Sequence, residues 1–344
     1  MSFKFKHFAI LTAALLILSV SIFSSCGSKN TDTQKEVVAV NPYIDSLTQA
    51  IERAPEKALL YAQRGEAFYA LESYDAAIND LNKAIELNPN EAAYHGILAN
   101  AYLDYYQSKK ALETMQNAAE RFPTDILTLL KLSEFQMILN EHGAAIQTAS
   151  SILEISPMNA EAFYMMGVNY KIMGDTTKAI NALQTSVEQD PDLLDGYYEL
   201  GLLWRNNGSG KLALQYFNNA LEIDPNHVPT LYAKGMYYTN RKMDNEAIKT
   251  FKLIHQIDRE YADPYFNIGI IYLEYDSLRQ AYANFNIAAE VEPTMTKAFY
   301  YRALTSEKMG DKKSAIRDYQ NARNLDKEDE YLAAIEKRLM ELRK

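Results

Sequence analysis

Apolar and small residues recur in this chain every 34 residues over most of its length. Prolines keep this spacing, and so do a series of alanines and a series of glycine, alanine or serine. These are Pro89, Pro123, Pro157, Pro191, Pro225 and Pro293; Ala77, Ala111, Ala145, Ala179, Ala213, Ala247, Ala281 and Ala315; and Gly65, Ala99, Ser133, Gly167, Gly201, Gly235, Gly269 and Ala303. A single globular core does not require residues to recur at a fixed spacing, whereas a stack of equivalent units does. The pattern therefore indicates such a stack.

Each block carries two apolar faces at helical spacing, separated by a break. In the fifth block Tyr197, Leu200 and Trp204 share one helical face, and a second face follows residues 207–210. The proline that closes the block disfavours helix at the residue before it. We therefore predict a helix A, a turn, a helix B and a turn in every block.

The small residues of helix A predict close packing within each pair, because a large side chain there would push helix B away. Aromatic residues at one register of helix B, such as Phe217 and Phe251, are expected to fill the remaining space. Two units have Arg259 and Lys327 where the others have proline, and we expect looser packing there. The acidic residues fall at registers that we expect to face solvent.

The pattern resembles the tetratricopeptide repeat (TPR) family. The fifth unit has every residue of the family pattern: Tyr197, Leu200, Gly201, Trp204, Ala213, Phe217, Ala220 and Pro225. The resemblance implies an all-α fold, a right-handed α-solenoid of about eight tandem helix-turn-helix repeats over residues 58–327. A single unit is too short to bury a core alone, so neighbouring units must stack. The two ends of the stack then need helices with a polar outer face. We expect an N-terminal half-repeat at residues 41–57 and a capping helix at residues 328–344.

The N-terminus has the features of a targeting signal. Lys4 and Lys6 precede an apolar run, and the run ends at Ser24, Ser25 and Cys26, the one cysteine of the chain. This order is typical of a secretory signal, and the run is short for a membrane span of about 20 residues. It resembles a bacterial lipoprotein signal over residues 1–25, followed by a tether at 26–40 that carries lipid on Cys26. The alternatives are an ordinary signal or an uncleaved anchor, with Cys26 incidental.

The lipoprotein resemblance implies a bacterial cell envelope location. Gly27 replaces the aspartate that keeps some lipoproteins in the inner membrane, which favours the outer membrane, facing the periplasm. The net charge is −10, and removal of Lys4 and Lys6 would make it more negative. Because phosphate backbones are bound through dense positive charge, we expect no nucleic-acid partner.

Catalytic and metal-binding patterns are not found in the sequence. The five histidines have no metal-ligand spacing and no cysteine beside them, so we predict no metal and no cofactor. No nucleophile or acid–base pair stands out. The signal, tether, repeats and cap use the whole chain, so we expect a protein that is not an enzyme.

In the TPR family the A helices line the concave wall. One register of that wall places five aromatic residues in successive units: Tyr164, Tyr198, Tyr232, Phe266 and Tyr300. Arg205, Asn206 and Asn240 lie at neighbouring registers and could bond a peptide backbone or a carboxylate. The alternative is that these rings mainly pack between units. The lysine–asparagine clamp with which some family members hold chaperone tails has no counterpart here.

Two functions fit these observations. The first is a lipid-anchored scaffold or adaptor that binds a protein or peptide partner in the envelope through its concave face. The second is a component of an envelope uptake system that binds a peptide or glycan ligand.

Overall fold

The computed structural model describes residues 41–327 and 330–343, which form eighteen α-helices joined by turns. Sixteen of them are eight A–B pairs, and the pairs follow one another at a constant spacing along the chain. The A helices are α2 (Ala58–Ala70), α4 (Ala92–Asp104), α6 (Ile126–Ile138), α8 (Ala160–Ile172), α10 (Leu194–Asn206), α12 (Val228–Asn240), α14 (Ala262–Glu274) and α16 (Thr296–Lys308). The B helices are α3 (Tyr74–Leu87), α5 (Ser108–Arg121), α7 (His142–Ile155), α9 (Thr176–Gln189), α11 (Gly210–Ile223), α13 (Asp244–Ile257), α15 (Leu278–Val291) and α17 (Lys312–Leu325).

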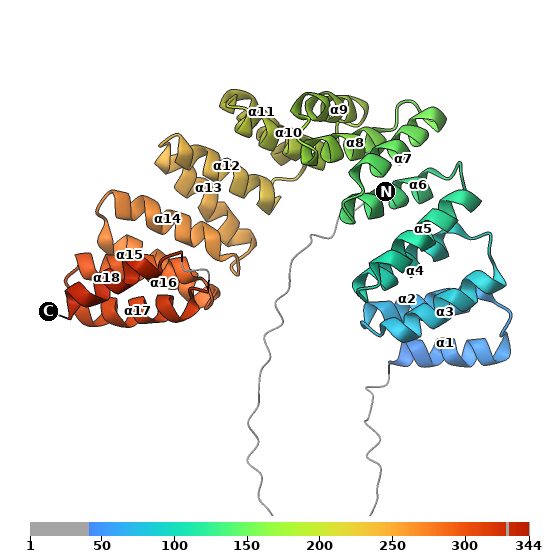
Figure 1. Cartoon of the computed structure of the whole chain (residues 1–344), viewed down its shortest axis with the longest axis horizontal. Coiled ribbons are helices and arrows are strands. Elements are labelled where there is room, and N and C mark those ends of the chain that lie inside the picture. The colour runs from blue at the N-terminus through green and yellow to red at the C-terminus, as the bar shows by residue number, and fades with distance from the viewer. Residues whose placement is uncertain (1–40, 328–329, 344) are drawn as a thin grey trace, which may run out of the picture.

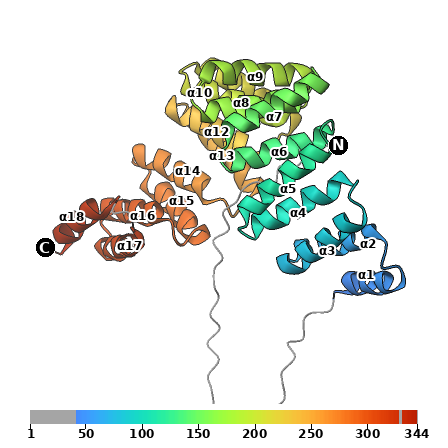
Figure 2. The ribbon, with the colours of Figure 1, turned by 45° about the vertical axis from the view of Figure 1, so that its right-hand side comes forward.

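The predicted all-α repeat fold is confirmed. Each helix packs against the next one along the chain, and the stack curves into an arch (Figure 1). The turned view shows the same sequential stacking, with the N-terminal and C-terminal repeats at opposite ends (Figure 2). Two further helices close the stack: α1 (Pro42–Arg53) covers α2, and α18 (Leu332–Leu342) covers α17.

Small residues of the A helices lie against large side chains of the B helices, as the sequence predicts. A Cβ atom added at Gly201 would lie 2.4 Å from Cε1 of Phe217, closer than van der Waals contact allows. Gly235 and Gly269 meet phenylalanine rings in the same way. Phe217 is fully buried, so the ring fills the space that the glycine leaves.

The end helices present polar outer faces. α1 buries Leu47 and Ile51 against the first repeat, and α18 buries Ile335 and Leu339 against the last. Their other faces carry exposed polar residues such as Gln49. This arrangement covers the apolar ends that a repeat stack would otherwise expose.

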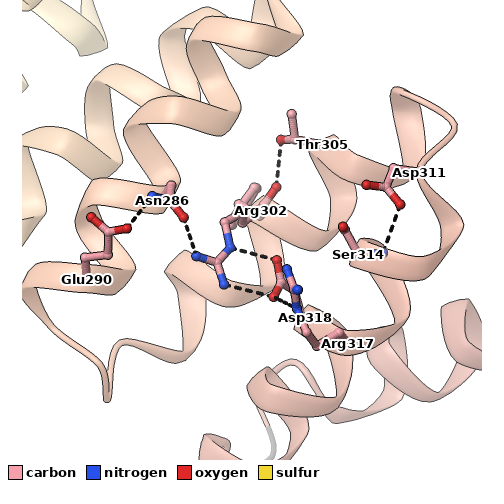
Figure 3. Close-up of polar contacts among 9 residues, drawn as sticks. Asn286, Glu290, Arg302, Thr305, Asp311, Ser314, Arg317 and Asp318 are labelled. Atoms are coloured by element: carbon pink, nitrogen blue, oxygen red, sulfur yellow. Dashed lines mark hydrogen bonds and ion pairs between the residues drawn. The ribbon is translucent and has the colours of Figure 1, made fainter.

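Two acidic residues are buried, contrary to the expectation that they face solvent. Asp318 is fully buried and bonded to Arg302, as Figure 3 shows. Asp80 is 7 % exposed and bonded to Arg64. The expectation was wrong because an arginine replaces the usual apolar residue on the facing A helix, and it supplies the pairing that a buried carboxylate needs.

α13 and α14, joined by the turn at Arg259, contact each other about as sparsely as α11 and α12, whose junction has Pro225. The missing proline therefore does not set this junction apart. In this turn the Asp258 side chain accepts a hydrogen bond from the Glu260 backbone, as the Asp190 and Asp224 side chains do in their own turns after α9 and α11.

The predicted signal peptide, Cys26 and the tether fall at residues 1–40, outside the described residues. Residues 328, 329 and 344 of the predicted cap lie outside them as well.

Candidate functional site

The A helices form the inner side of the arch. Successive A helices contact each other along the stack, with α12 and α14 approaching least, whereas successive B helices make at most isolated contacts. Elements on the inside of a curved stack are the ones that crowd together. At the top of the arch in Figure 1, α8 and α10 accordingly lie inside α9 and α11.

Five aromatic rings follow one register of this inner face, and we call them the aromatic ladder. They are Tyr164 on α8, Tyr198 on α10, Tyr232 on α12, Phe266 on α14 and Tyr300 on α16. All five are half-buried. Each ring packs in part against buried core residues, and the rest of it remains accessible to solvent.

The buried part of each ring packs against the following repeat. Tyr198 meets His227 edge-on with centroids 5.7 Å apart, and Tyr232 lies 5.4 Å from the Tyr261 ring. Phe266 meets Tyr301 at 5.5 Å. The ladder therefore ties neighbouring repeats together besides presenting a surface.

Burial of the ladder tyrosines changes the pKa of their phenol groups. Burial raises the pKa of Tyr198 and Tyr232 above the usual value, and that of Tyr164 well above it. Asn267 donates a hydrogen bond of 3.2 Å to the Tyr232 hydroxyl. These tyrosines are neutral at physiological pH, so the ladder is an uncharged surface.

Apolar side chains continue this surface one helical turn further along each A helix. Val168, Leu202, Met236, Ile270 and Leu304 occupy this second register. Val168 is 9 % exposed, and the other four are half-buried. Together with the ladder they form what we call the inner wall of repeats 4–8.

Charged residues on the wall are largely paired across adjacent repeats. Lys297 bonds Asp263 at 2.6 Å, and Lys171 bonds Glu199 at 2.5 Å. Arg205 is different, because its one polar contact within the described residues is a 3.4 Å bond to Asn206 of its own helix. Asn206 and Asn240 are exposed at the ends of α10 and α12.

Family comparisons agree with this geometry. Two models of the tetratricopeptide repeat match the chain, over residues 58–91 and 164–228. The matched segments are helix pairs of the stack described above.

The chain contains tetratricopeptide repeats.

Solved structures include several TPR stacks that are similar to this chain. A chain of the APC/C hetero-tetramer Cut9-Hcn1 has a TM-score of 0.53 and 16 % identity, over 86 % of this chain and 58 % of that one. A TPR protein from Parabacteroides merdae has a TM-score of 0.49 and 18 % identity, over 74 % and 99 % of the two chains. YrrB, a TPR protein with an unusual peptide-binding site, has a TM-score of 0.46 and 23 % identity, over 57 % of this chain and 99 % of that one. At so low an identity the first likeness shows the fold alone. No curated protein matches in sequence.

Exposed apolar side chains also recur at the A-to-B turns of most repeats. They are Leu71, Tyr105, Tyr106, Ile138, Ile172 and Met173 in repeats 1–4, and Met243, Tyr275 and Met309 in repeats 6–8. Tyr105 stacks on Tyr74 with centroids 5.6 Å apart, and Tyr106 is 95 % exposed. Helix registers alone do not predict these turn residues. The signal was present, since the turn position recurs once in every repeat.

Open pockets also occur off the inner wall. One of about 450 Å³ lies beside the turns of repeats 6 and 7 and is lined by Met243, Ile271 and Tyr275 among others. A second, of about 380 Å³, follows one face of α13 and shares Asn245 and Ile248 with the first.

Residues 41–327 and 330–343 carry neither a metal-binding cluster nor a membrane-spanning helix. These residues contain no group of three or more histidine, cysteine or acidic side chains that could hold a metal ion. No helix within the same ranges is long and apolar enough to cross a bilayer.

Proposed function

We propose that this TPR protein is a non-catalytic adaptor that holds a protein or peptide partner against the inner wall of repeats 4–8. TPR proteins bind such partners, and curved repeat stacks use their extended inner surfaces for recognition. The observation that carries the proposal is the aromatic ladder, in which five consecutive repeats each place a partly exposed ring at the same register of the A helix. The apolar second register doubles the width of that surface.

The wall suits a polypeptide better than a small molecule. It is a long open face rather than an enclosed cavity, and the two pockets lie elsewhere. Aromatic side chains on such a face can anchor apolar side chains of a partner, and peripheral polar groups then fix its position.

We further propose that lipid on Cys26 holds the protein in the bacterial envelope, at the outer membrane facing the periplasm. The support is the sequence of residues 1–26. Each methylene of an acyl chain adds about 0.8 kcal/mol of membrane affinity, so several chains on one cysteine would anchor it firmly. Labelling of cells with a lipid precursor should mark the wild-type chain and leave Cys26→Ala unmarked. Equal labelling would refute the anchor.

The test of the adaptor function is capture of partners from envelope extracts with the purified full chain. Replacement of Tyr198, Tyr232 and Phe266 together by alanine should abolish capture, whereas a matched triple change of the exposed Tyr43, Tyr106 and Tyr275 should not. Because ladder rings also support the core, circular dichroism must show that the fold is kept. Met236→Glu tests the same wall without removing a ring.

Two results would count against the adaptor. If both the ladder variant and Met236→Glu stay folded and still capture the partner, the wall is not the binding face. If the wild-type chain recovers a small peptide or glycan and no protein, the uptake function is the better one.

A further inference from the structure

Seven of the eight basic residues on the A helices either pair with a carboxylate or donate a hydrogen bond to another helix, and the inference drawn from the eighth rests on the proposed function. The eight A helices lie wholly within the described residues and carry eight lysines or arginines. Six of them pair with a carboxylate, and Lys234 donates to the Asn218 side chain of the preceding repeat at 2.7 Å. The six are Arg64, Lys131, Lys171, Lys297, Arg302 and Lys308.

Arg205 is the exception. No carboxylate of the described residues lies within ion-pair distance of its guanidinium, and its one hydrogen bond, to Asn206, is long at 3.4 Å. A guanidinium has five N–H donors, so most of them have no protein partner here. Arg205 is only partly exposed, because its helix lies on the inner side of the stack.

The surroundings of Arg205 are apolar on the wall side. Tyr198, Leu202 and Arg205 lie on one face of α10, at positions i, i+4 and i+7. The arginine is close enough to Tyr198 to oppose the rise in that phenol's pKa. Asn240, in the next repeat, forms no side-chain hydrogen bond within the described part of the chain and ends the adjacent A helix.

A partner that covers the wall would remove water from Arg205. A cation that loses its hydration without gaining an anion is strongly unfavourable, so the partner must bring the anion. Lys171 in the preceding repeat and Lys297 further along the wall are already neutralised by Glu199 and Asp263. The wall therefore has a place for one negative charge among apolar contacts.

We propose that Arg205 is the anion-binding residue of the inner wall and that the bound segment presents to it one aspartate or glutamate side chain flanked by apolar residues. A carboxylate can accept two parallel N–H bonds from a guanidinium, which fixes its orientation as well as its charge. Asn206 and Asn240 lie where they can bond the adjacent backbone of that segment.

An internal acidic side chain fits better than a chain terminus. The second register is apolar on both sides of Arg205, with Val168 in repeat 4 and Met236 in repeat 6. A segment that ended at the arginine would leave one of these sides uncovered. A segment that passes through covers both.

The experiment uses three blocked nonapeptides, acetylated and amidated, with alternating leucine and serine and a central Glu, Gln or Lys. Binding of each peptide is measured by isothermal titration calorimetry rather than by tryptophan fluorescence, because Trp204, next to Arg205 in the sequence, packs against buried core residues. The full wild-type chain should bind the Glu peptide about tenfold more tightly than the Gln peptide. In Arg205→Gln that preference should vanish, and in Arg205→Glu the Lys peptide should bind best.

Lys211→Gln is the matched control, because Lys211 is an exposed cation of the same repeat that forms no ion pair in the described chain. It should leave the preference unchanged. Three results would overturn the proposal: equal binding of the Glu and Gln peptides, a Glu preference that survives Arg205→Gln, or no saturable binding of any peptide. A fourth peptide with a free C-terminal carboxylate and no acidic side chain should bind no better than the Gln peptide, and stronger binding would refute the internal side chain.

The failure of this inference can be told apart from failure of the adaptor function. If partner capture is lost in the ladder variant but unchanged in Arg205→Glu, the wall binds a partner, but Arg205 does not bind a carboxylate of that partner. If the ladder variant also captures normally, the adaptor function itself fails.

Discussion

The guanidinium of Arg302 bonds both carboxylate oxygens of Asp318, at 2.7 and 2.8 Å, inside the last repeat (Figure 3). A third bond of 2.8 Å joins Arg302 to Asn286 of the preceding repeat. The same three-way arrangement recurs in the first repeat, where Arg64 bonds Asp80 and, at 3.0 Å, Thr48. These three residues stand seven repeats before Arg302, Asp318 and Asn286. Both ends of the stack therefore contain the same arginine-centred hydrogen-bond cluster, which we call the polar lock.

Loss of the Asp318 carboxylate is expected to loosen the C-terminal end. Asp318→Ala leaves Arg302 buried with an uncompensated charge, and breaking such a pair costs about 3–5 kcal/mol. Because repeat stacks can lose their ends separately, the effect should concentrate in α16–α18. Hydrogen exchange of these helices, together with urea denaturation followed by circular dichroism, measures it.

A matched double variant separates charge from packing. Arg302→Leu with Asp318→Thr installs the pair that repeat 3 has at these positions, Leu132 and Thr148. Its stability should lie within about 1 kcal/mol of wild type, because no charge is left buried. Lys83→Ala, which breaks the exposed Lys83–Glu86 pair, should change stability by less than about 1 kcal/mol. Unchanged protection of α16–α18 in Asp318→Ala would contradict the lock.

The repeat period allowed the fold to be predicted, whereas the polar locks escaped the sequence analysis. Glycine, alanine and proline spacing reports backbone approach and helix ends, and these are local properties that repeat in every unit. In the sequence, Asp80 and Asp318 cannot be told apart from acidic residues that lie on the surface. Their burial depends on an arginine of the facing A helix, which is a property of one repeat and not of the period.

The candidate site was predictable in position but not in chemistry. The ladder register followed from the TPR resemblance, and the structure leaves its rings half-buried. Whether Arg205 has a partner depends on which side chains of neighbouring repeats reach it. Lys171 finds Glu199 in the next repeat, and no period in the sequence indicates that pairing.

Close packing at Gly201 predicts a sharp response to one added methyl group. In Gly201→Ala the new Cβ would lie 2.4 Å from the Phe217 ring, and overpacking costs about 1–3 kcal/mol. That cost opposes the gain of about 1 kcal/mol that alanine brings as a helix former. We expect net destabilisation, measured as a lower urea midpoint.

Gly96 supplies the control, since nothing lies within 4 Å of a Cβ built there. Gly96→Ala should stabilise α4 by up to about 1 kcal/mol. Adding Phe217→Met to Gly201→Ala imitates the pairing of Ala99 with Met115 in repeat 2 and should recover part of the loss. If Gly201→Ala gains as much stability as Gly96→Ala, the contact does not limit packing.

Every A-to-B turn contains one residue in the left-handed conformation, and five of the eight are not glycine. Glu72 has a φ of 57°, and Gly174 occupies the same turn position in repeat 4 with a φ of 81°. Left-handed backbone costs a residue with a Cβ about 1–2 kcal/mol, partly offset by the greater freedom of glycine in the unfolded chain. Thermal denaturation should show Glu72→Gly stabilised by up to about 1 kcal/mol and Gly174→Ala destabilised by a similar amount. A change of the same sign in both would contradict this.

His255 predicts how stability depends on pH. Its ring stacks on Tyr265 with centroids 3.6 Å apart, and its Nε2 is buried without a hydrogen-bond partner. Burial, aided by Lys252, lowers the pKa of His255 to about 4 from its ordinary value of 6.5. Between these values the unfolded chain binds the proton and the folded chain does not. Stability from this group is therefore complete above pH 6.5 and is lost progressively as the pH falls toward 4.

His255→Phe keeps a ring against Tyr265 and removes the titration. Urea midpoints at pH 7, 6 and 5 should fall for the wild-type chain and fall less steeply for the variant. The comparison stops at pH 5 because carboxylates begin to titrate below it. His95, whose pKa burial also lowers, stays in both proteins, so some slope will persist in the variant. Parallel slopes in the two proteins would show that His255 takes up its proton as readily in the folded chain as in the unfolded one.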